Sequence, residues 1–157
     1  MSATASRANG DRMSAALVAV DGEAPDSEAV RMACELLSGS NSNLYIVYVI
    51  EVERGLALDA EMVPATARGE EVLKDMEEIA KSFRINVEAE LLQARRAGTA
   101  IVQEAVDKRV EAVVLGVPYQ EAYGSYSLGH TARYVLENVP CRVVLWRDTI
   151  SQTVKPR

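Results

Sequence analysis

Strand-sized apolar runs alternate with helical stripes along the whole chain. Five segments have the length and composition of β-strands, namely residues 15–20, 44–50, 85–91, 110–117 and 141–147. The first, second and fourth are continuous apolar runs, as expected of strands covered on both faces. In the third, apolar residues alternate strictly with polar ones, which leaves one face in water. We therefore predict that the third strand lies at or near an edge of the sheet.

Between the strands, apolar residues recur at intervals of three and four, the spacing of one buried helix face. The four stripes are Val30, Ala33, Cys34 and Leu37; Val72, Met76, Ile79 and Phe83; Ile101, Val102, Ala105 and Val106; and Ala132, Val135, Leu136 and Val139. We expect Asp26 or Ser27 to cap the first helix and Thr99 to cap the third, because their side-chain oxygens can accept from free N–H groups. Pro64 suits the first turn of the second helix, and Pro140 ends the fourth.

This alternation of strands and helices is typical of an α/β protein. Such chains fold as an open parallel sheet with right-handed crossovers and helices on both faces. We therefore predict a three-layer, Rossmann-like fold with five parallel strands. With the third strand at an edge, a simple strand order is 3-2-1-4-5. The order then reverses between the first and fourth strands, and a ligand crevice is expected there, outside the carboxyl ends of the strands.

Two loops flank the predicted crevice and differ in charge. Loop 21–26 holds three acidic residues, which would repel phosphate and suit the hydroxyl or amine groups of a ligand. Loop 116–129 has a glycine at each end and a single acid, Glu121. A phosphate is therefore expected at the second loop, on the N–H groups around Gly129 and at the positive end of the fourth helix.

Composition and charge narrow the class of protein. The chain has 157 residues, 48% hydrophobic and 25% charged, which suits one domain with a full core. Its net charge of -6 argues against binding nucleic acid or anionic membranes. No apolar run is long enough to insert into a bilayer and no signal-peptide core is visible, so a cytoplasmic location is expected. We expect a disordered leader at 1–13, the domain at 14–147 and a tail at 148–157.

The two cysteines, Cys34 and Cys141, are far apart and match no metal or redox spacing. Cys34 falls on the apolar face of the first helix, and Cys141 starts the last strand. Both are predicted to be small buried hydrophobic residues, and no metal site is predicted.

Several motifs along the chain match one family pattern. They are Val18-Ala19-Val20-Asp21-Gly22 at the first strand end, Tyr48-Val49-Ile50 at the second, Gly116 after the fourth, Leu128-Gly129, and residues 134–143, where a helix runs into Pro140-Cys141 and a β-branched strand. Over residues 15–147 the chain thus resembles a universal stress protein domain. The resemblance implies a fold of the adenine nucleotide alpha hydrolase-like type.

Family members that bind ATP carry a glycine, two residues, a glycine, nine residues, and a glycine followed by Ser or Thr. In this chain the first and last glycines are Gly116 and Gly129, at the expected spacing. Tyr119 replaces the middle glycine and His130 replaces the hydroxyl residue. A tyrosine resists both positive φ and close approach to phosphate, and Pro118 removes one N–H donor. The triphosphate site is therefore expected to be altered.

The resemblance also implies an adenine nucleotide in the crevice. Asp21 and Val49 match family positions that contact ribose and adenine, so a nucleoside or monophosphate remains a candidate ligand. The implied cofactor is ATP or AMP, with Mg²⁺ only together with the nucleotide. The implied binding residues are Ala19, Val20, Asp21, Val49, Leu115, Gly116, Gly129, His130 and Thr131.

His130 and the tyrosines of the second loop each allow two interpretations. His130 could meet a phosphate at the helix start, or simply lie partly exposed in a loop. Tyr119, Tyr123 and Tyr126 could stack on an aromatic ligand. The favoured alternative is that they pin the loop to the domain and partly fill the vacated phosphate space. No Ser or Cys is visibly paired with the histidine, so no catalytic residue is predicted and an enzyme ranks last.

The last strand is expected to form the second edge of the sheet. It carries Val144 and Trp146, and an uncovered apolar edge favours pairing with another strand. Universal stress domains commonly dimerise through this strand, so a homodimer through residues 141–147 is predicted.

The favoured function is a dimeric stress-response regulator that senses an adenine nucleotide. The alternative is a protein-interaction module without nucleotide, such as a regulator of a transporter or stress-response partner, and the sequence does not identify that partner.

Overall fold

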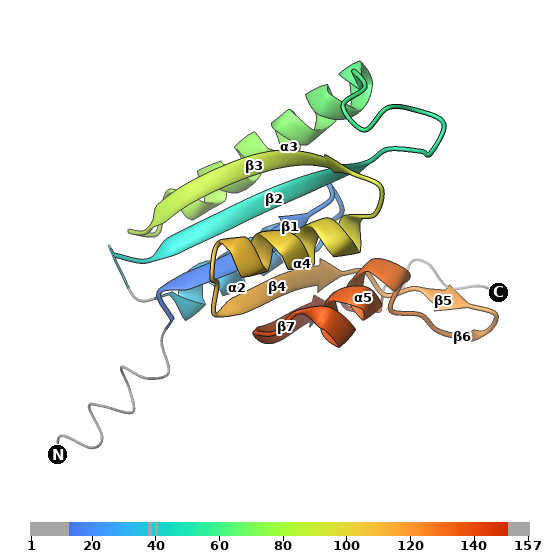
Figure 1. Cartoon of the computed structure of the whole chain (residues 1–157). Coiled ribbons are helices and arrows are strands. Elements are labelled where there is room, and N and C mark those ends of the chain that lie inside the picture. Colours follow the sequence, from blue (N-terminus) through green and yellow to red (C-terminus); the bar gives the residue numbers. More distant parts are fainter. Residues whose placement is uncertain (1–12, 38, 40, 151–157) are drawn as a thin grey trace, which may run out of the picture.

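The strands and helices follow the predicted order (Figure 1). The computed structural model describes residues 13–37, 39 and 41–150. Its large sheet contains β1 (Ala15–Val20), β2 (Asn43–Glu51), β3 (Asn86–Ala94), β4 (Ala112–Val117) and β7 (Arg142–Arg147). The helices are α2 (Asp26–Leu36), α3 (Val63–Ala80), α4 (Ala97–Asp107) and α5 (His130–Asn138). Two short strands, β5 (Glu121–Ala122) and β6 (Ser125–Tyr126), form a hairpin.

The sheet has the order β3-β2-β1-β4-β7, and every neighbouring pair is parallel. This confirms the predicted Rossmann-like topology, with β3 at one edge and the reversal of strand order between β1 and β4. Helices α2 and α3 pack on one face of the sheet, and α4 and α5 on the other (Figure 1). None of the described helices is long and apolar enough to cross a membrane.

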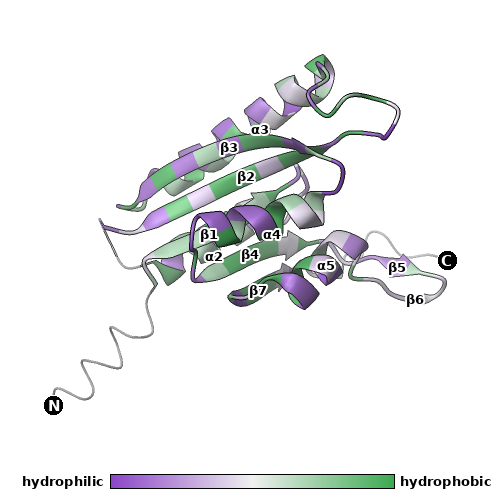
Figure 2. Cartoon of the chain, in the orientation of Figure 1, coloured by the Kyte–Doolittle hydropathy of each residue, from purple (hydrophilic) through white to green (hydrophobic). Residues whose placement is uncertain are grey.

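The central strands are apolar throughout because both of their faces are covered. In β1, Val18 and Val20 belong to the core beneath α2 and α3, whereas Leu17 belongs to the core beneath α4 and α5. The residues of β3 are at most half-buried, and hydrophilic and hydrophobic positions alternate along this strand (Figure 2). The alternation in the sequence thus correctly indicated an edge strand.

The predicted helix caps are wrong. Helix α4 begins two residues before Thr99, whose hydroxyl donates a hydrogen bond to the carbonyl of Arg96 at 2.9 Å. Helix α2 is preceded by Pro25, so Asp26 and Ser27 lie inside its first turn. The Asp26 carboxylate accepts hydrogen bonds from the preceding loop and not from the helix. Both side chains thus use other local hydrogen bonds in place of a cap.

The described part of the chain begins inside the segment predicted as a leader. Met13 is buried and forms a parallel bridge with Leu37, so the fold includes one residue more than expected at this end. The rest of the predicted leader, residues 1–12, and residues 151–157 of the predicted tail lie outside the described residues.

The two cysteines differ in burial. Cys34 is buried as predicted, and burial raises the pKa of its thiol to about 11. Cys141 is only half-buried, because it directly precedes the edge strand β7. The prediction of a fully buried residue is therefore wrong for Cys141.

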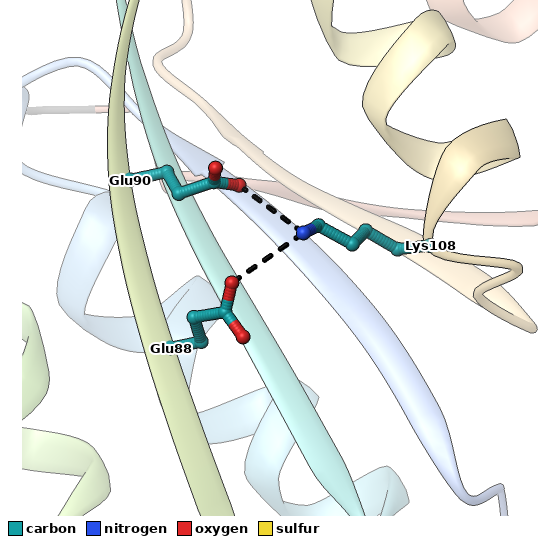
Figure 3. Close-up of polar contacts among 3 residues, drawn as sticks. All are labelled: Glu88, Glu90 and Lys108. Atoms are coloured by element: carbon teal, nitrogen blue, oxygen red, sulfur yellow. Dashed lines mark hydrogen bonds and ion pairs between the residues drawn. The ribbon is translucent and has the colours of Figure 1, made fainter.

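An acidic cluster with one lysine joins β3 to the end of α4 (Figure 3). Lys108 Nζ lies 3.4 Å from Glu88 Oε2 and 3.8 Å from Glu90 Oε1, and 5.4 Å from the centroid of the Tyr45 ring. Buried oxygens of Glu90 and Glu104 have no N–H or O–H donor, and a proton shared between the two carboxyls would supply one. Their mutual hydrogen bond, together with burial, raises the pKa of Glu104 to about 7.

This cluster makes the stability of the fold depend on pH. Because the pKa of Glu104 is raised from 4.5 in the folded protein, the fold retains a proton that the unfolded chain releases. Stability should therefore fall as the pH rises from about 5 to about 8. Glu104→Gln should remove this loss, so in urea unfolding the variant gains up to about 1 kcal/mol over the wild type at the higher pH only.

A matched control is Glu71→Gln, which removes the same charge from an exposed site on α3. The control should leave the wild-type pH dependence unchanged. A Glu104→Gln variant that loses stability with rising pH as steeply as the wild type would contradict this interpretation.

Candidate functional site

A cavity of about 590 Å³ opens at the carboxyl ends of β1 and β4, where the strand order reverses. Every residue that the sequence implicated in nucleotide binding lines it. These residues are Ala19, Val20, Asp21, Val49, Leu115, Gly116, Gly129, His130 and Thr131. Segments from the beginning, middle and end of the chain therefore meet at one place in the fold.

The cavity also contains residues that sequence reasoning did not assign to it. They are Glu23, Ala97, Ile101, Val117, Pro118, Gln120, Leu128 and Ala132. The contribution of α4 was missed because Ile101 belongs to an apolar stripe that core packing already explains. The strand order could have indicated the contribution of α4, since a helix that joins the edge strand β3 to β4 must cross over β2 and β1. Its first turn therefore reaches the crevice.

The first loop is held by a buried carboxylate. Asp26 is 3% exposed, and its Oδ2 accepts hydrogen bonds from the N–H of Gly22 at 2.7 Å and of Asp21 at 3.2 Å. Burial raises the pKa of Asp26 to about 7, the Gly22 N–H opposes this, and the charge of Asp21 adds to it. Asp21 itself is exposed at the cavity, and its Oδ1 accepts from the N–H of Glu23 at 3.0 Å.

Gly116 is required by packing between the end of β4 and the start of α2. A Cβ at this position would lie 2.7 Å from the Pro25 carbonyl oxygen and 2.9 Å from its Cβ. Gly129, which precedes α5, is glycine for a different reason. Its φ is 88°, a backbone conformation that residues with a Cβ rarely adopt. The first and last glycines of the pattern are thus present, and Gly116 is in close contact with Pro25.

The tyrosines of the second loop lie outside the cavity. The rings of Tyr119 and Tyr126 are 5.5 Å apart, and the Arg147 guanidinium lies 5.2 Å from the first and 5.9 Å from the second. Tyr119 Oη also donates a hydrogen bond to Glu121 Oε2 at 2.8 Å. The contacts of Tyr119 and Tyr126 pin the loop to β7, as favoured from the sequence, whereas Tyr123 is fully exposed and the prediction is wrong for it. The expectation that the rings fill phosphate space is wrong, since none of the three tyrosines lines the cavity.

The charge of the cavity is predominantly acidic. Among the described residues that line it, Asp21 and Glu23 are acidic, and none is lysine or arginine. Positive potential comes from the N-terminal end of α5, where His130 lies. A smaller cavity of about 110 Å³ shares His130 and Thr131 and contains Arg96. Within the described residues, no group of three or more His, Cys, Asp or Glu could hold a metal ion.

The fold and the crevice define a single-domain α/β protein of the Rossmann-like type. The family model described as the universal stress protein family matches residues 13–147, so the chain belongs to this family. A universal stress protein of Methanocaldococcus jannaschii is 25% identical over 135 residues, which cover 82% of this chain and 79% of that protein.

Solved structures show the same fold at lower identity. A universal stress protein from Archaeoglobus fulgidus has a TM-score of 0.69 and 21% identity, over 83% of this chain and 96% of that chain. A structure of the Archaeoglobus fulgidus protein in complex with dAMP has a TM-score of 0.64 and 22% identity, over 83% and 94%. A universal stress protein in complex with cAMP has a TM-score of 0.66 and 18% identity, over 87% and 98%.

The packing at Gly116 is testable through stability. In Gly116→Ala the new methyl group collides with backbone and ring atoms of Pro25, which cannot rotate away. The variant should lose about 1–3 kcal/mol of unfolding free energy in urea titration. Gly55→Ala is the control, because its Cβ meets nothing within 4 Å, and it should lose no stability. Equal stabilities of the two variants would show that Gly116 is not required by packing.

Proposed function

We propose that this protein is a dimeric regulatory domain that senses an adenine nucleoside or its monophosphate in the crevice between β1 and β4. The observation that carries the proposal is that one cavity, at the reversal of strand order, is lined by all nine residues implicated from the sequence. The dAMP and cAMP complexes of proteins with the same fold support this ligand class. Both of those ligands carry one phosphate.

The cavity suits a nucleoside in its shape and chemistry. Val49, Ile101 and Leu115 offer apolar surface for a base. The carboxylate of Asp21 is an acceptor for ribose hydroxyls. A single phosphate would lie at the N-terminal end of α5, near Gly129 and His130, and a protonated imidazole would be stabilised only by such an anion.

A triphosphate is disfavoured by both charge and backbone. Its several negative charges would face Asp21 and Glu23 with no lysine or arginine among the described lining residues. Pro118 provides no N–H donor, and Tyr119 is not among the described residues with positive φ. ATP is therefore proposed as a weaker ligand than AMP, with Mg²⁺ entering only together with a nucleotide.

Thermal unfolding with added ligands tests this order. A ligand that binds only the folded state stabilises it by about 3 kcal/mol at a hundredfold excess over its Kd. Adenosine and AMP should raise the melting temperature by several degrees, and ATP with magnesium by less. Asp21→Asn should reduce the shifts, whereas Glu71→Gln on α3 should not. A larger shift with ATP than with AMP would overturn the proposed ligand class.

The same assay tests the cause of weak ATP binding. Combining Tyr119→Gly with His130→Ser restores the family residues at both altered positions, so the ATP shift should grow relative to the wild type. Tyr123→Gly is a matched control, because Tyr123 lies at the hairpin tip outside the cavity. An unchanged ATP shift in the double variant would place the cause elsewhere, in the acidic loop or Pro118.

We further propose that two copies pair through β7. This strand ends the described sheet, and the side chains of Val143, Val144, Leu145 and Trp146 are only half-buried. Light scattering at micromolar protein should give the mass of a dimer. Trp146→Lys should shift the mass toward that of a monomer, because a charge on the edge opposes strand pairing. Unchanged circular dichroism is the control for folding, and a monomeric wild type would refute the pairing.

A second candidate function is a protein-interaction module that acts without nucleotide. The observation in its favour is the β5-β6 hairpin, whose tip residue Tyr123 is fully exposed at a positive φ of 54°. An exposed aromatic side chain on a short hairpin suits contact with another protein. A transporter or stress-response protein is the proposed kind of partner. If no adenine ligand shifts the melting temperature, this candidate replaces the first.

A further inference from the structure

Asp26 is a buried carboxylate whose partners belong to the cavity loop. It begins α2, yet no side chain caps this helix, and the Asp26 oxygens face backward to the residues that follow β1. The N–H of Gly22 donates to Oδ2 at 2.7 Å, and the N–H of Asp21 lies 3.2 and 3.3 Å from the two oxygens. One side chain therefore holds two consecutive N–H groups of the loop.

The loop is held more loosely on its outer side. The exposed Arg68 of α3 donates a hydrogen bond to the Gly22 carbonyl at 3.4 Å. The carboxylate of Asp21 bonds the N–H of Glu23 and lines the cavity. The hydrogen bonds to Asp26 are shorter than the one from Arg68, and Asp26 is buried whereas Arg68 is exposed. The position of Asp21 therefore depends mainly on the Asp26 carboxylate.

We propose that Asp26 is a positioning residue for the proposed nucleoside site: in its ionised form it holds the Asp21–Gly22 backbone so that the Asp21 carboxylate faces the ligand, and protonation of Asp26 weakens ligand binding. The inference rests on the proposed function for its ligand. The effect of Asp26 ionisation on the Asp21–Gly22 backbone can be measured without any ligand.

The charged groups around Asp26 set the direction of the effect. Asp21 is the nearest of them, Glu23 follows in the same loop, Arg68 reaches Gly22 from α3, and His130 lines the same cavity from α5. Protonation turns Asp26 from an acceptor of two N–H groups into a hydrogen-bond donor, with the Asp21 carboxylate as its neighbouring acceptor. That carboxylate is then occupied and no longer offered to a ribose hydroxyl.

The size of the effect follows from the ionised fraction. Burial raises the pKa of Asp26 to about 7, so ionisation changes across the neutral range. If only the ionised form binds, affinity scales with its fraction and falls up to about tenfold from pH 8 to pH 6. Adenosine is the suitable probe, because it carries no phosphate that titrates in this range.

The first measurement follows the backbone amide resonances of Asp21 and Gly22 with pH in the wild-type protein without ligand. They should titrate together with an inflection near pH 7. Asp26→Asn, which has the same shape and cannot ionise, should abolish this inflection. Glu28→Gln is the matched control, because Glu28 lies in the same helix turn and pairs with Arg31 instead. Amides that do not titrate between pH 6 and 8 would overturn the inference without any variant.

The second measurement is the adenosine affinity by calorimetry at pH 6 and pH 8. The wild type and Glu28→Gln should bind up to about tenfold more weakly at pH 6. Asp26→Asn should show no change in affinity between the two pH values and should bind no more tightly than the wild type at pH 6, because its amide donates to Asp21 as the protonated acid does. A purely structural role would lower stability without flattening the pH profile.

The outcomes separate the two proposals. Wild-type binding that is equal at both pH values would overturn the positioning role of Asp26 alone. An Asp26→Asn variant that keeps the wild-type pH profile would do the same. Absence of adenosine binding at both pH values in the wild type would overturn the proposed function, and this inference with it.

Discussion

The site depends on close contact between the end of β4 and the start of α2. Gly116 approaches the backbone of Pro25 so closely that a methyl group would collide with it. This contact lies at the reversal of strand order, where the pairing of β1 with β4 joins the two halves of the sheet. The next residue, Asp26, holds the loop that follows β1. One packing contact therefore fixes the relative position of the two loops that enclose the cavity, and the chemistry of the cavity is built on it.

Most of the fold could be predicted because each strand and helix shows its own periodicity. The alternation along β3 indicated that this strand lies at an edge of the sheet. With β3 at the edge the strand order could be predicted, and the reversal in that order marks the position of the crevice. Other features depend on contacts between distant segments. The Glu90–Glu104 pair, for example, joins a strand to a helix. The contact of Asp26 with Gly22 spans only four residues, but it was missed because capping rules consider only the N–H groups of the helix. The β5-β6 hairpin was missed because its two-residue strands show no periodicity.

Tyr119 shows how one substitution changes two regions of the molecule. At position 119, where family members that bind ATP have a glycine, this chain has a tyrosine. Its ring packs against Tyr126 and Arg147. Arg147 ends β7, and Pro118, next to Tyr119, lines the cavity. The rim of the cavity and the edge strand β7 are therefore joined through the contacts of Arg147 with two aromatic rings. The ring of Tyr119 thus holds the second loop against β7 through its contacts with Tyr126 and Arg147.

The charge of the cavity restricts the proposed class of ligand more than the volume of the cavity does. A cavity of about 590 Å³ has room for a nucleotide, so volume does not exclude a triphosphate. The N-terminal end of a helix supplies roughly half a positive charge, which matches part of one phosphate and little of three. Asp21 and Glu23 add negative charge at the cavity itself. With no lysine or arginine among the described lining residues, the cavity offers little to balance a second or third phosphate, which supports the proposal of a ligand with one phosphate or none.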